Sequence, residues 1–151
     1  MSESYDVAII GAGPGGYVAA IRCAQLGMNT VCIDEWKNIK GKASLGGTCL
    51  NVGCIPSKAL LESSENYYQA KYKFSHHGVM VDNVSADVPV MIARKDKIVN
   101  TFTAGIASLF KKNKVKSIHG KGTLLKRELS ADTWIINVSD NGTTETIQAK
   151  H

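Results

Sequence analysis

The sequence lacks any apolar run that approaches the length of a membrane span, because a spanning helix needs about 20 consecutive apolar residues. It also lacks a leader pattern. Residues 1–5 lead directly into an apolar segment, without the layout of a signal peptide or of an Arg-rich transit peptide. These absences predict a protein with no membrane partner and a cytoplasmic location.

A recognisable nucleic-acid-binding module is also missing, although the formal net charge is +5. Much of this charge comes from one lysine run, which comprises Lys111, Lys112, Lys114 and Lys116. A nucleic-acid site usually adds interleaved aromatic residues, and none stands between these lysines. The run is better explained as the solvated C-terminus of a helix, where the helix dipole favours cations. We therefore expect no nucleic-acid partner.

Metal-ligand spacing is absent as well. The four cysteines include one close pair, Cys49 and Cys54, with no second pair or His/His partner at ligand spacing, so we expect no metal site. Without a secretory signal, cysteines indicate a reducing compartment, where a disulfide is more often catalytic than structural. Two unrelated buried thiols remain the alternative for this pair. Cys23 and Cys32 are expected to be buried and without a redox role.

What the sequence does contain is a distinctive setting for the Cys49/Cys54 pair. Five residues of regular helix rise about 7.5 Å, too far for a disulfide, so a bridge here needs a bent or incomplete helical turn. Gly53 allows unusual backbone angles, and Pro56 suits the first turn of a helix. Cys54 would then lie just before a helix N-terminus, where the dipole favours a thiolate, and Lys58 adds a positive charge one turn further on. This setting favours a redox-active dithiol/disulfide pair over a structural disulfide.

A dinucleotide-binding pattern precedes the cysteine pair. The 151 residues, 44% of them hydrophobic, are enough for one domain. The first part of the chain is predicted to form a buried parallel strand, a glycine-rich turn, a helix and a second strand, at residues 5–10, 11–16, 17–26 and 30–33. Gly11, Gly13 and Gly16 match G-x-G-x-x-G, and Asp34 ends the second strand where an acid can bind a ribose diol. The complete unit predicts a dinucleotide site, with the phosphates at the helix N-terminus.

The rest of the chain extends this α/β pattern. Helices are predicted at 57–74 and 88–112, a third parallel strand at 115–119, and short antiparallel strands at 123–126, 133–139 and 143–148. Gly120, after the third parallel strand, is expected to offer its backbone to an adenine. The apolar stripe of helix 88–112 is interpreted as core packing, and Asp140-Asn141-Gly142 predicts a hairpin turn. The predicted fold is α/β: a Rossmann-like domain with a parallel sheet, crossover helices and a small antiparallel β-meander, incomplete at the C-terminus.

Two segments carry a resemblance to a known family. Residues 5–17 (YDVAIIGAGPGGY) and 46–61 (GGTCLNVGCIPSKALL) are similar to the FAD-binding start and the redox segment of the flavoprotein disulfide reductases. Within that family, the residues of these segments are most similar to those of the dihydrolipoamide dehydrogenases. The resemblance covers the whole chain, whereas the chain covers only the N-terminal part of the family pattern.

The resemblance implies a role for each motif. Cys49 would be the interchange thiol that attacks lipoamide disulfide, and Cys54 the thiolate facing the flavin of FAD. Lys58 would approach the flavin and stabilise negative charge on it. The residues implied to contact FAD are Gly11, Gly13, Pro14, Gly15, Gly16, Asp34, Gly47, Thr48, Cys49, Lys58 and Gly120.

The family's other parts have no counterpart here. The sequence contains no second G-x-G-x-x-G for NAD, no C-terminal His/Glu base pair and no dimerisation domain. We therefore expect a fragment, residues 1–151 being the first part of the FAD-binding domain, that does not turn over alone. The resemblance implies a homodimeric whole enzyme whose partner is the lipoyl domain of 2-oxo acid dehydrogenase complexes. The alternatives are a glutathione or mercuric reductase, a non-catalytic nucleotide-binding module, and a plain NAD-dependent dehydrogenase domain.

Overall fold

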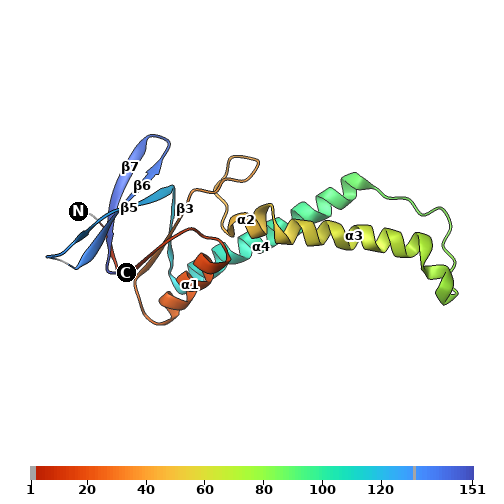
Figure 1. Cartoon of the computed structure of the whole chain (residues 1–151), viewed down its shortest axis with the longest axis horizontal. Coiled ribbons are helices and arrows are strands. Elements are labelled where there is room, and N and C mark those ends of the chain that lie inside the picture. The colour runs from red at the N-terminus through yellow and green to blue at the C-terminus, as the bar shows by residue number, and fades with distance from the viewer. Residues whose placement is uncertain (1–2, 131) are drawn as a thin grey trace.

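The computed structural model describes residues 3–130 and 132–151. Two sheets and helix α1 occupy one end of the molecule, and a long helical hairpin extends from them (Figure 1). The elements in chain order are β1 (Ser4–Tyr5), β2 (Val7–Ile10), α1 (Pro14–Gln25), β3 (Thr30–Asp34), α2 (Gly47–Asn51), α3 (Cys54–Tyr72), the 3-10 turn η1 (Phe74–His77), α4 (Val88–Asn113), β4 (Lys116–His119), β5 (Lys121–Glu128), β6 (Thr133–Asp140) and β7 (Thr143–Ala149).

The first sheet is the predicted parallel one. Its order is β2-β3-β4, with β3 pairing parallel to both neighbours. The central strand β3 is apolar over Val31, Cys32 and Ile33, all fully buried, as a strand covered on both faces requires. The α/β class predicted from the sequence is therefore confirmed.

The second sheet has the order β1-β7-β6-β5. Strands β5, β6 and β7 form the predicted antiparallel meander, and Asn141 and Gly142 both take positive φ angles, as the hairpin turn requires. The prediction of one strand over residues 5–10 is wrong. The chain changes sheets at Asp6, because the amides of Asp6 and Val7 both donate to the carbonyl of Asn29 (2.8 and 3.3 Å), which leaves Tyr5 to pair with β7.

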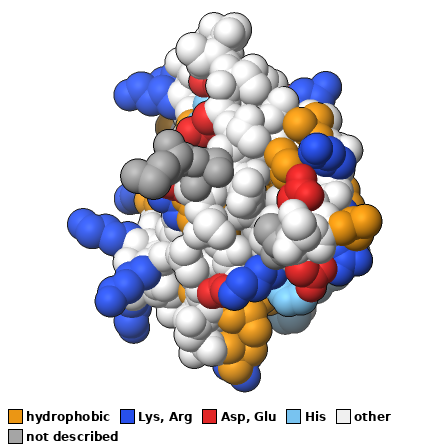
Figure 2. Space-filling view, turned by 90° about the vertical axis from the view of Figure 1, so that its left-hand side faces the viewer, with side chains coloured by type: hydrophobic (Ala, Val, Ile, Leu, Met, Phe, Trp, Pro, Cys, Tyr) orange, Lys and Arg blue, Asp and Glu red, His pale blue; other side chains and the backbone are white. Residues whose placement is uncertain are grey.

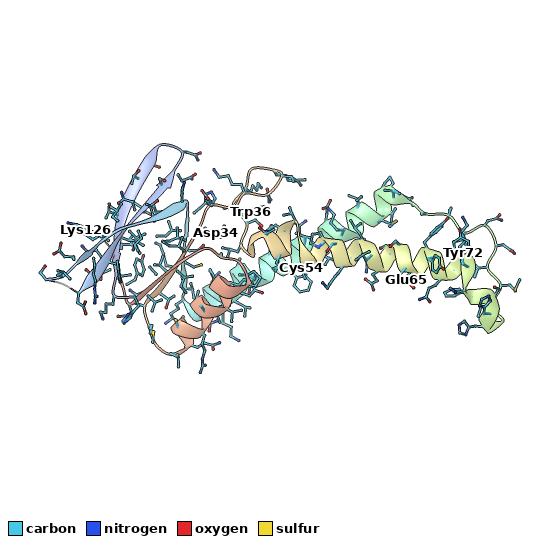
Figure 3. All side chains as sticks on the ribbon, viewed as in Figure 1. Asp34, Trp36, Cys54, Glu65, Tyr72 and Lys126 are labelled. Atoms are coloured by element: carbon cyan, nitrogen blue, oxygen red, sulfur yellow. The ribbon has the colours of Figure 1, made fainter. Side chains whose placement is uncertain are left out.

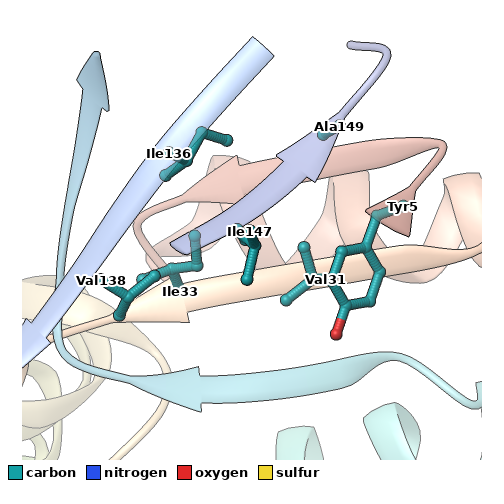
Figure 4. Packing of buried hydrophobic residues seen from close by; sticks show 7 residues of the cluster. All are labelled: Tyr5, Val31, Ile33, Ile136, Val138, Ile147 and Ala149. Atoms are coloured by element: carbon teal, nitrogen blue, oxygen red, sulfur yellow. The ribbon is translucent and has the colours of Figure 1, made fainter. Parts of the chain in front are cut away.

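Apolar side chains fill the space on both faces of the parallel sheet. One cluster lies between the two sheets (Figure 4) and comprises Tyr5, Val31, Ile33, Ile136, Val138, Ile147 and Ala149. A second lies under the helices and comprises Ala12, Ala20, Cys32, Leu50, Ile106, Phe110 and Val115. The parallel sheet is therefore held from both sides, which fixes the positions of the turns at its strand ends.

The hairpin of α3 and α4 changes the interpretation of the apolar stripe on α4. Ile106 and Phe110 are buried as predicted, but Phe102 and Leu109 are about half exposed (50% and 45%). The first half of α4 extends beyond the sheets and runs beside α3 (Figure 1). Core packing is therefore confirmed only for the part of α4 that covers the sheet. Arg94 holds the outer part by donating to the Ala59 carbonyl of α3 at 2.9 Å.

Several predicted boundaries were also inaccurate. Helix α1 begins at Pro14 rather than residue 17, because proline at the first helical position needs no hydrogen-bonded N–H. Helix α3 begins at Cys54 rather than residue 57, with Gly53 as its N-cap. Parallel strand β4 begins at Lys116, one residue later than predicted. Strand β5 extends two residues beyond its predicted bounds at each end, and β6 and β7 each extend one residue further at their C-terminal ends.

The surface of the sheet end is mixed in character. Figure 2 shows lysine and arginine side chains around its rim, with acidic and apolar groups between them. Within residues 3–130 and 132–151, no helix combines the length and apolar character needed to cross a membrane.

Candidate active site

The glycine-rich turn between β2 and α1 is shaped by two glycines that cannot be replaced easily. Gly11 has φ +101°, a region that side chains disfavour, and its amide donates to the Ile33 carbonyl at 2.7 Å. A Cβ on Gly16 would lie 1.7 Å from the Gly11 carbonyl oxygen. At Gly13 and Gly15, by contrast, an added Cβ meets nothing within 4 Å. The backbone at these two positions is therefore open to a ligand.

Asp34 braces this turn. One carboxylate oxygen accepts from the Ala12 amide at 2.5 Å and the other from the Trp36 amide at 2.8 Å. The side chain thus joins the glycine-rich turn to the loop after β3, a role that sequence reasoning missed. Each oxygen retains a further lone pair, so the carboxylate can still accept from a ribose hydroxyl.

A groove of about 330 Å³ runs along the ends of the parallel strands. Five predicted FAD-contacting residues line it: Gly11, Asp34, Gly47, Thr48 and Gly120. Gly120 has φ +149°, and its amide donates to the Asp34 carbonyl at 3.0 Å. The groove also includes Glu35, Trp36 and Lys121, which sequence reasoning did not single out. These residues follow strands β3 and β4, and the general rule that ligands of such sheets bind at the carboxyl ends of the strands could have identified them.

The redox segment packs directly on the glycine-rich turn. The Gly46 amide donates to the Ala12 carbonyl at 2.9 Å. Gly47 has φ +59°, and a Cβ on it would lie 2.7 Å from the Cα of Gly13. Only a pair of glycines allows the two backbones to come this close. Helix α2, which carries Cys49, therefore starts against the turn that would hold a dinucleotide.

The two cysteines meet across the junction of α2 and α3. A Cβ on Gly53 would lie 2.9 Å from the Thr48 carbonyl oxygen and 3.1 Å from the Cα of Cys49, so only glycine fits at this junction. Both cysteines are free, and the Cys54 side chain is close enough to perturb the pKa of the Cys49 thiol. The pair is thus close enough to act together, as a dithiol requires.

This contact sets the protonation of Cys49. The hydrogen bond with Cys54 is the main cause that raises the pKa of the Cys49 thiol, followed by desolvation and by the negative charge of Cys54. A backbone hydrogen bond with Cys54 and, as a smaller cause, the positive charge of Lys58 lower that pKa. The contact with Cys54 therefore favours the protonated form of Cys49.

Some site residues lie differently from the sequence prediction. Cys54 is the first residue of α3 rather than the residue before it. Cys54 is also exposed and Cys49 only half-buried, so exposure alone does not select Cys49 as the thiol that meets a substrate. Lys58 lines a separate surface hollow between α3 and α4, outside the groove. Figure 3 shows Asp34 and Trp36 at the sheet end and Cys54 where the hairpin begins.

The other two cysteines lie away from the pair. Cys32 is fully buried, and burial raises the pKa of its thiol to about 12, with the Asp34 charge as a further cause. Cys23 is only half-buried, so the prediction of burial holds in full for Cys32 alone. Among the described residues, no cluster of three or more His, Cys, Asp or Glu side chains could hold a metal ion.

Comparison with known proteins agrees with this arrangement. The family model described as pyridine nucleotide-disulphide oxidoreductase matches residues 5–151. The chain belongs to the pyridine nucleotide-disulphide oxidoreductase family. Among curated relatives, dihydrolipoyl dehydrogenase 2, mitochondrial, of Arabidopsis thaliana is 55% identical over 133 residues, 87% of this chain and 25% of its own length. The dihydrolipoyl dehydrogenase of Cupriavidus necator is 50% identical over 92% of this chain and 29% of its own length.

A third oxidoreductase relative carries a different name. Leghemoglobin reductase of Vigna unguiculata is 49% identical over 99% of this chain and 27% of its own length. The chain thus spans about a quarter of the length of the curated relatives it matches.

The prediction of a cytoplasmic location is contradicted. The relatives from Arabidopsis thaliana, Pisum sativum and Schizosaccharomyces pombe are all named mitochondrial. The prediction was wrong because it relied on the missing leader pattern, and a missing pattern does not establish a location.

Proposed function

We propose that this chain is the FAD- and dithiol-bearing segment of a dihydrolipoyl dehydrogenase. The single observation that carries the proposal is the contact of Gly47 on Gly13, which brings the dithiol helix onto the dinucleotide turn. A module that only bound nucleotide would have no need for a hydrogen-bonded thiol pair at that place. The names of the relatives from Arabidopsis and Cupriavidus support lipoamide chemistry in particular.

The residues present fit FAD. The backbone at Gly13 and Gly15 is open for a pyrophosphate, and Asp34 and Gly120 line the groove where the adenosine half would lie. Gly11 and Gly16 would shape the turn, Pro14 would start the helix whose dipole favours phosphate, and Gly47, Thr48 and Cys49 would lie toward the flavin. Lys58, which lines the hollow between α3 and α4, would reach the flavin only by turning its side chain out of that hollow. When bound, FAD would supply a two-electron acceptor beside the dithiol.

The cysteine pair would exchange electrons with dihydrolipoamide by thiol–disulfide exchange. A substrate thiolate attacks the Sγ of Cys49 in the Cys49–Cys54 disulfide, which forms a mixed disulfide and releases the Cys54 thiolate. The second substrate thiol then displaces Cys49. The substrate leaves as a cyclic disulfide, and its two electrons remain on the Cys49/Cys54 dithiol. In that dithiol, the raised pKa of Cys49 favours a proton on its sulfur.

The remaining parts of the proposal concern the whole protein. Residues 1–151 would form the first part of its FAD-binding domain, and its NAD site and homodimer interface would lie in segments that the relatives have beyond this stretch. Its macromolecular partner would be a lipoyl domain of a 2-oxo acid dehydrogenase complex. The location proposed for the whole protein is mitochondrial, which the names of three relatives support.

The test combines FAD binding with thiol mapping. We expect FAD added to the chain to lose fluorescence on binding, and oxidised dithiothreitol to join Cys49 to Cys54 in one peptide pair by mass spectrometry. Cys23→Ser is the matched control and should leave both results unchanged, whereas Cys49→Ser should abolish the bridge. A chain that forms no Cys49–Cys54 bridge, or that binds NAD but not FAD, would contradict the proposal.

The substrate is tested separately. The name of the Vigna relative shows that a similar segment serves another reductase, and glutathione and mercuric reductases remain alternatives. The whole protein should oxidise dihydrolipoamide with NAD⁺ and leave glutathione disulfide and Hg²⁺ unreduced. If the protein reduced glutathione disulfide or Hg²⁺ faster than it oxidised dihydrolipoamide, the faster-reacting compound would be assigned as the substrate instead.

A further inference from the structure

Asn51, the last residue of α2, makes three side-chain hydrogen bonds, two to the loop before α2 and one to the first residue of α2. Its amide nitrogen donates to the carbonyls of Leu45 (3.2 Å) and Gly47 (2.9 Å). Its amide oxygen accepts from the Ser44 hydroxyl at 2.8 Å. An Asn amide can make four hydrogen bonds, so nearly all of its capacity is spent on residues 44–47.

These bonds reach beyond the helix. The bond to Gly47 lies within α2 itself, but Ser44 and Leu45 belong to the loop before it. The tied segment is the one that touches the dinucleotide turn, through the Gly46 amide on the Ala12 carbonyl and through Gly47 on Gly13. Asn51 therefore ties the C-terminal end of α2 to residues 44–47, and these residues hold the N-terminal end of α2 against the dinucleotide turn.

Asn51 also lies between the two cysteines in sequence. Cys49 precedes it on α2, and Cys54 follows after Gly53. A loss of the Asn51 bonds frees residues 44–47, so α2 and the Cys49 it carries can shift relative to both the turn and Cys54. Position 51 thus influences the distance from Cys49 to Cys54 and the distance from Cys49 to the dinucleotide turn. Both must be fixed for dithiol chemistry.

We infer that Asn51 is a positioning residue, which holds the Cys49/Cys54 dithiol in register with the dinucleotide turn. The inference rests on the proposed function, since it assigns a role within that same site. None of its three hydrogen bonds involves a cysteine sulfur, so Asn51 acts through the Ser44 hydroxyl and the carbonyls of Leu45 and Gly47.

The experiment compares four variants with the wild-type chain. Asn51→Ala removes all three bonds, Asn51→Asp keeps the shape and the acceptor but removes the donor, and Ser44→Ala removes one bond. Asn38→Ala is the matched control: its amide oxygen accepts from the amides of Lys40 and Lys42 in the exposed loop and from no residue of α2. All variants are measured well below their thermal unfolding midpoints, so that each is folded.

Two readouts are used. The first is the equilibrium constant for forming the Cys49–Cys54 disulfide, in which the two thiols pass two hydrogens and two electrons to oxidised dithiothreitol. The second is the long-wavelength thiolate-to-flavin absorption of the reduced protein at saturating FAD. A role in stability alone would shift the unfolding midpoint and leave both readouts unchanged in the folded protein.

We expect Asn51→Ala and Asn51→Asp to lower the exchange constant about tenfold, the factor that corresponds to the net contribution of about one hydrogen bond. The thiolate-to-flavin absorption should weaken in both variants, Ser44→Ala should show a smaller change, and Asn38→Ala none. If Asn51→Ala does not fold, Asn51→Asp decides. Wild-type values in a folded Asn51 variant would overturn the inference while leaving the proposed function intact. A wild-type chain that forms no bridge would overturn the proposed function itself.

Discussion

At the scale of single residues, the thiol of Cys49 shows how the site distributes charge. Its pKa is raised chiefly by the hydrogen bond with Cys54 and lowered by Lys58. Because a raised pKa means less thiolate at a given pH, Cys54 suppresses the nucleophilicity of Cys49 in the reduced pair and Lys58 partly restores it.

Under reducing conditions, Cys54→Ala should therefore lower the pKa of Cys49 and speed its alkylation at neutral pH. Lys58→Met should have the opposite effect, because it removes a positive charge that stabilises the thiolate. Cys23→Ala serves as the control. The measurement is the pH–rate profile of iodoacetamide labelling, read at the Cys49 peptide. An unchanged midpoint in Cys54→Ala would refute the assigned cause.

Single residues were predictable where a local motif determined them. Gly11 and Gly16 follow from the fingerprint, because a tight turn and close helix packing occur within a few residues of each other. The two backbone bonds of Asp34 were not predictable, because they depend on how the turn and the loop after β3 approach each other in space. The contact of Gly47 on Gly13 was missed for the same reason.

At the scale of elements, the junction of α2 and α3 depends on the absence of a side chain at Gly53. A Cβ there would enter the space of the Thr48 carbonyl and the Cys49 backbone. The two helices can therefore meet closely enough for their thiols to touch only with glycine between them.

Gly53→Ala should destabilise the chain by about 1–3 kcal/mol, the usual cost of forcing extra atoms into a packed site. It should also weaken formation of the Cys49–Cys54 bridge. Gly105→Ala is a matched control in α4, where an added Cβ meets nothing within 4 Å. That change should stabilise the chain by about 0.5–1 kcal/mol, because alanine is the better helix former. Urea unfolding of the three proteins checks both signs, and equal midpoints for Gly53→Ala and wild type would be the contrary result.

The long helices could be predicted from the sequence, but the elements that pack against them could not. The apolar period of residues 88–112 indicated a helix, and α4 is one. The period could not show that the first half of α4 runs beside α3 and away from the sheets, or that Phe102, near the middle of α4, is half exposed. The short helix α2 was not predicted, because five residues carry too little pattern for a periodic signal.

At the scale of the whole molecule, the two ends of the chain are joined. The Gln148 amide donates to the Glu3 carbonyl at 3.0 Å and the His151 amide to the Asp6 carbonyl at 3.0 Å. The carboxylate of Asp6 adds hydrogen bonds from Lys150 (2.7 Å) and from the Asn29 amide (2.9 Å). These bonds lower the pKa of Asp6, with the Lys150 bond as the largest cause.

The sign of the resulting pH dependence follows from linkage. A carboxyl whose pKa is lower in the folded state stabilises the fold above its ordinary pKa of 3.8, and this contribution is lost as the pH falls through the lowered value. Asp6→Asn should therefore be less stable than wild type at pH 7 and should lose less stability on acidification. Urea midpoints at neutral and acidic pH test this. A constant difference between the two proteins would contradict it.

The topology was only partly predictable. The order of the parallel strands follows from the βαβ pattern and the strand after α4. The parallel pairing of β1 with β7 joins residues at opposite ends of the sequence, and a strand's period does not identify its partner. The prediction of a single strand over residues 5–10 was wrong because the sequence did not identify β7 as the strand that pairs with Tyr5.

This pairing imposes an order on biosynthesis. A ribosome releases Tyr5 early, yet β7, the neighbour of Tyr5 in the sheet, emerges only as residues 143–149 are translated. Contacts between such distant residues form slowly, and the cluster around Tyr5 cannot close before they exist. A nascent chain halted before residue 143 leaves Tyr5 without its strand neighbour, so this part of the fold completes only after nearly the whole stretch has been synthesised.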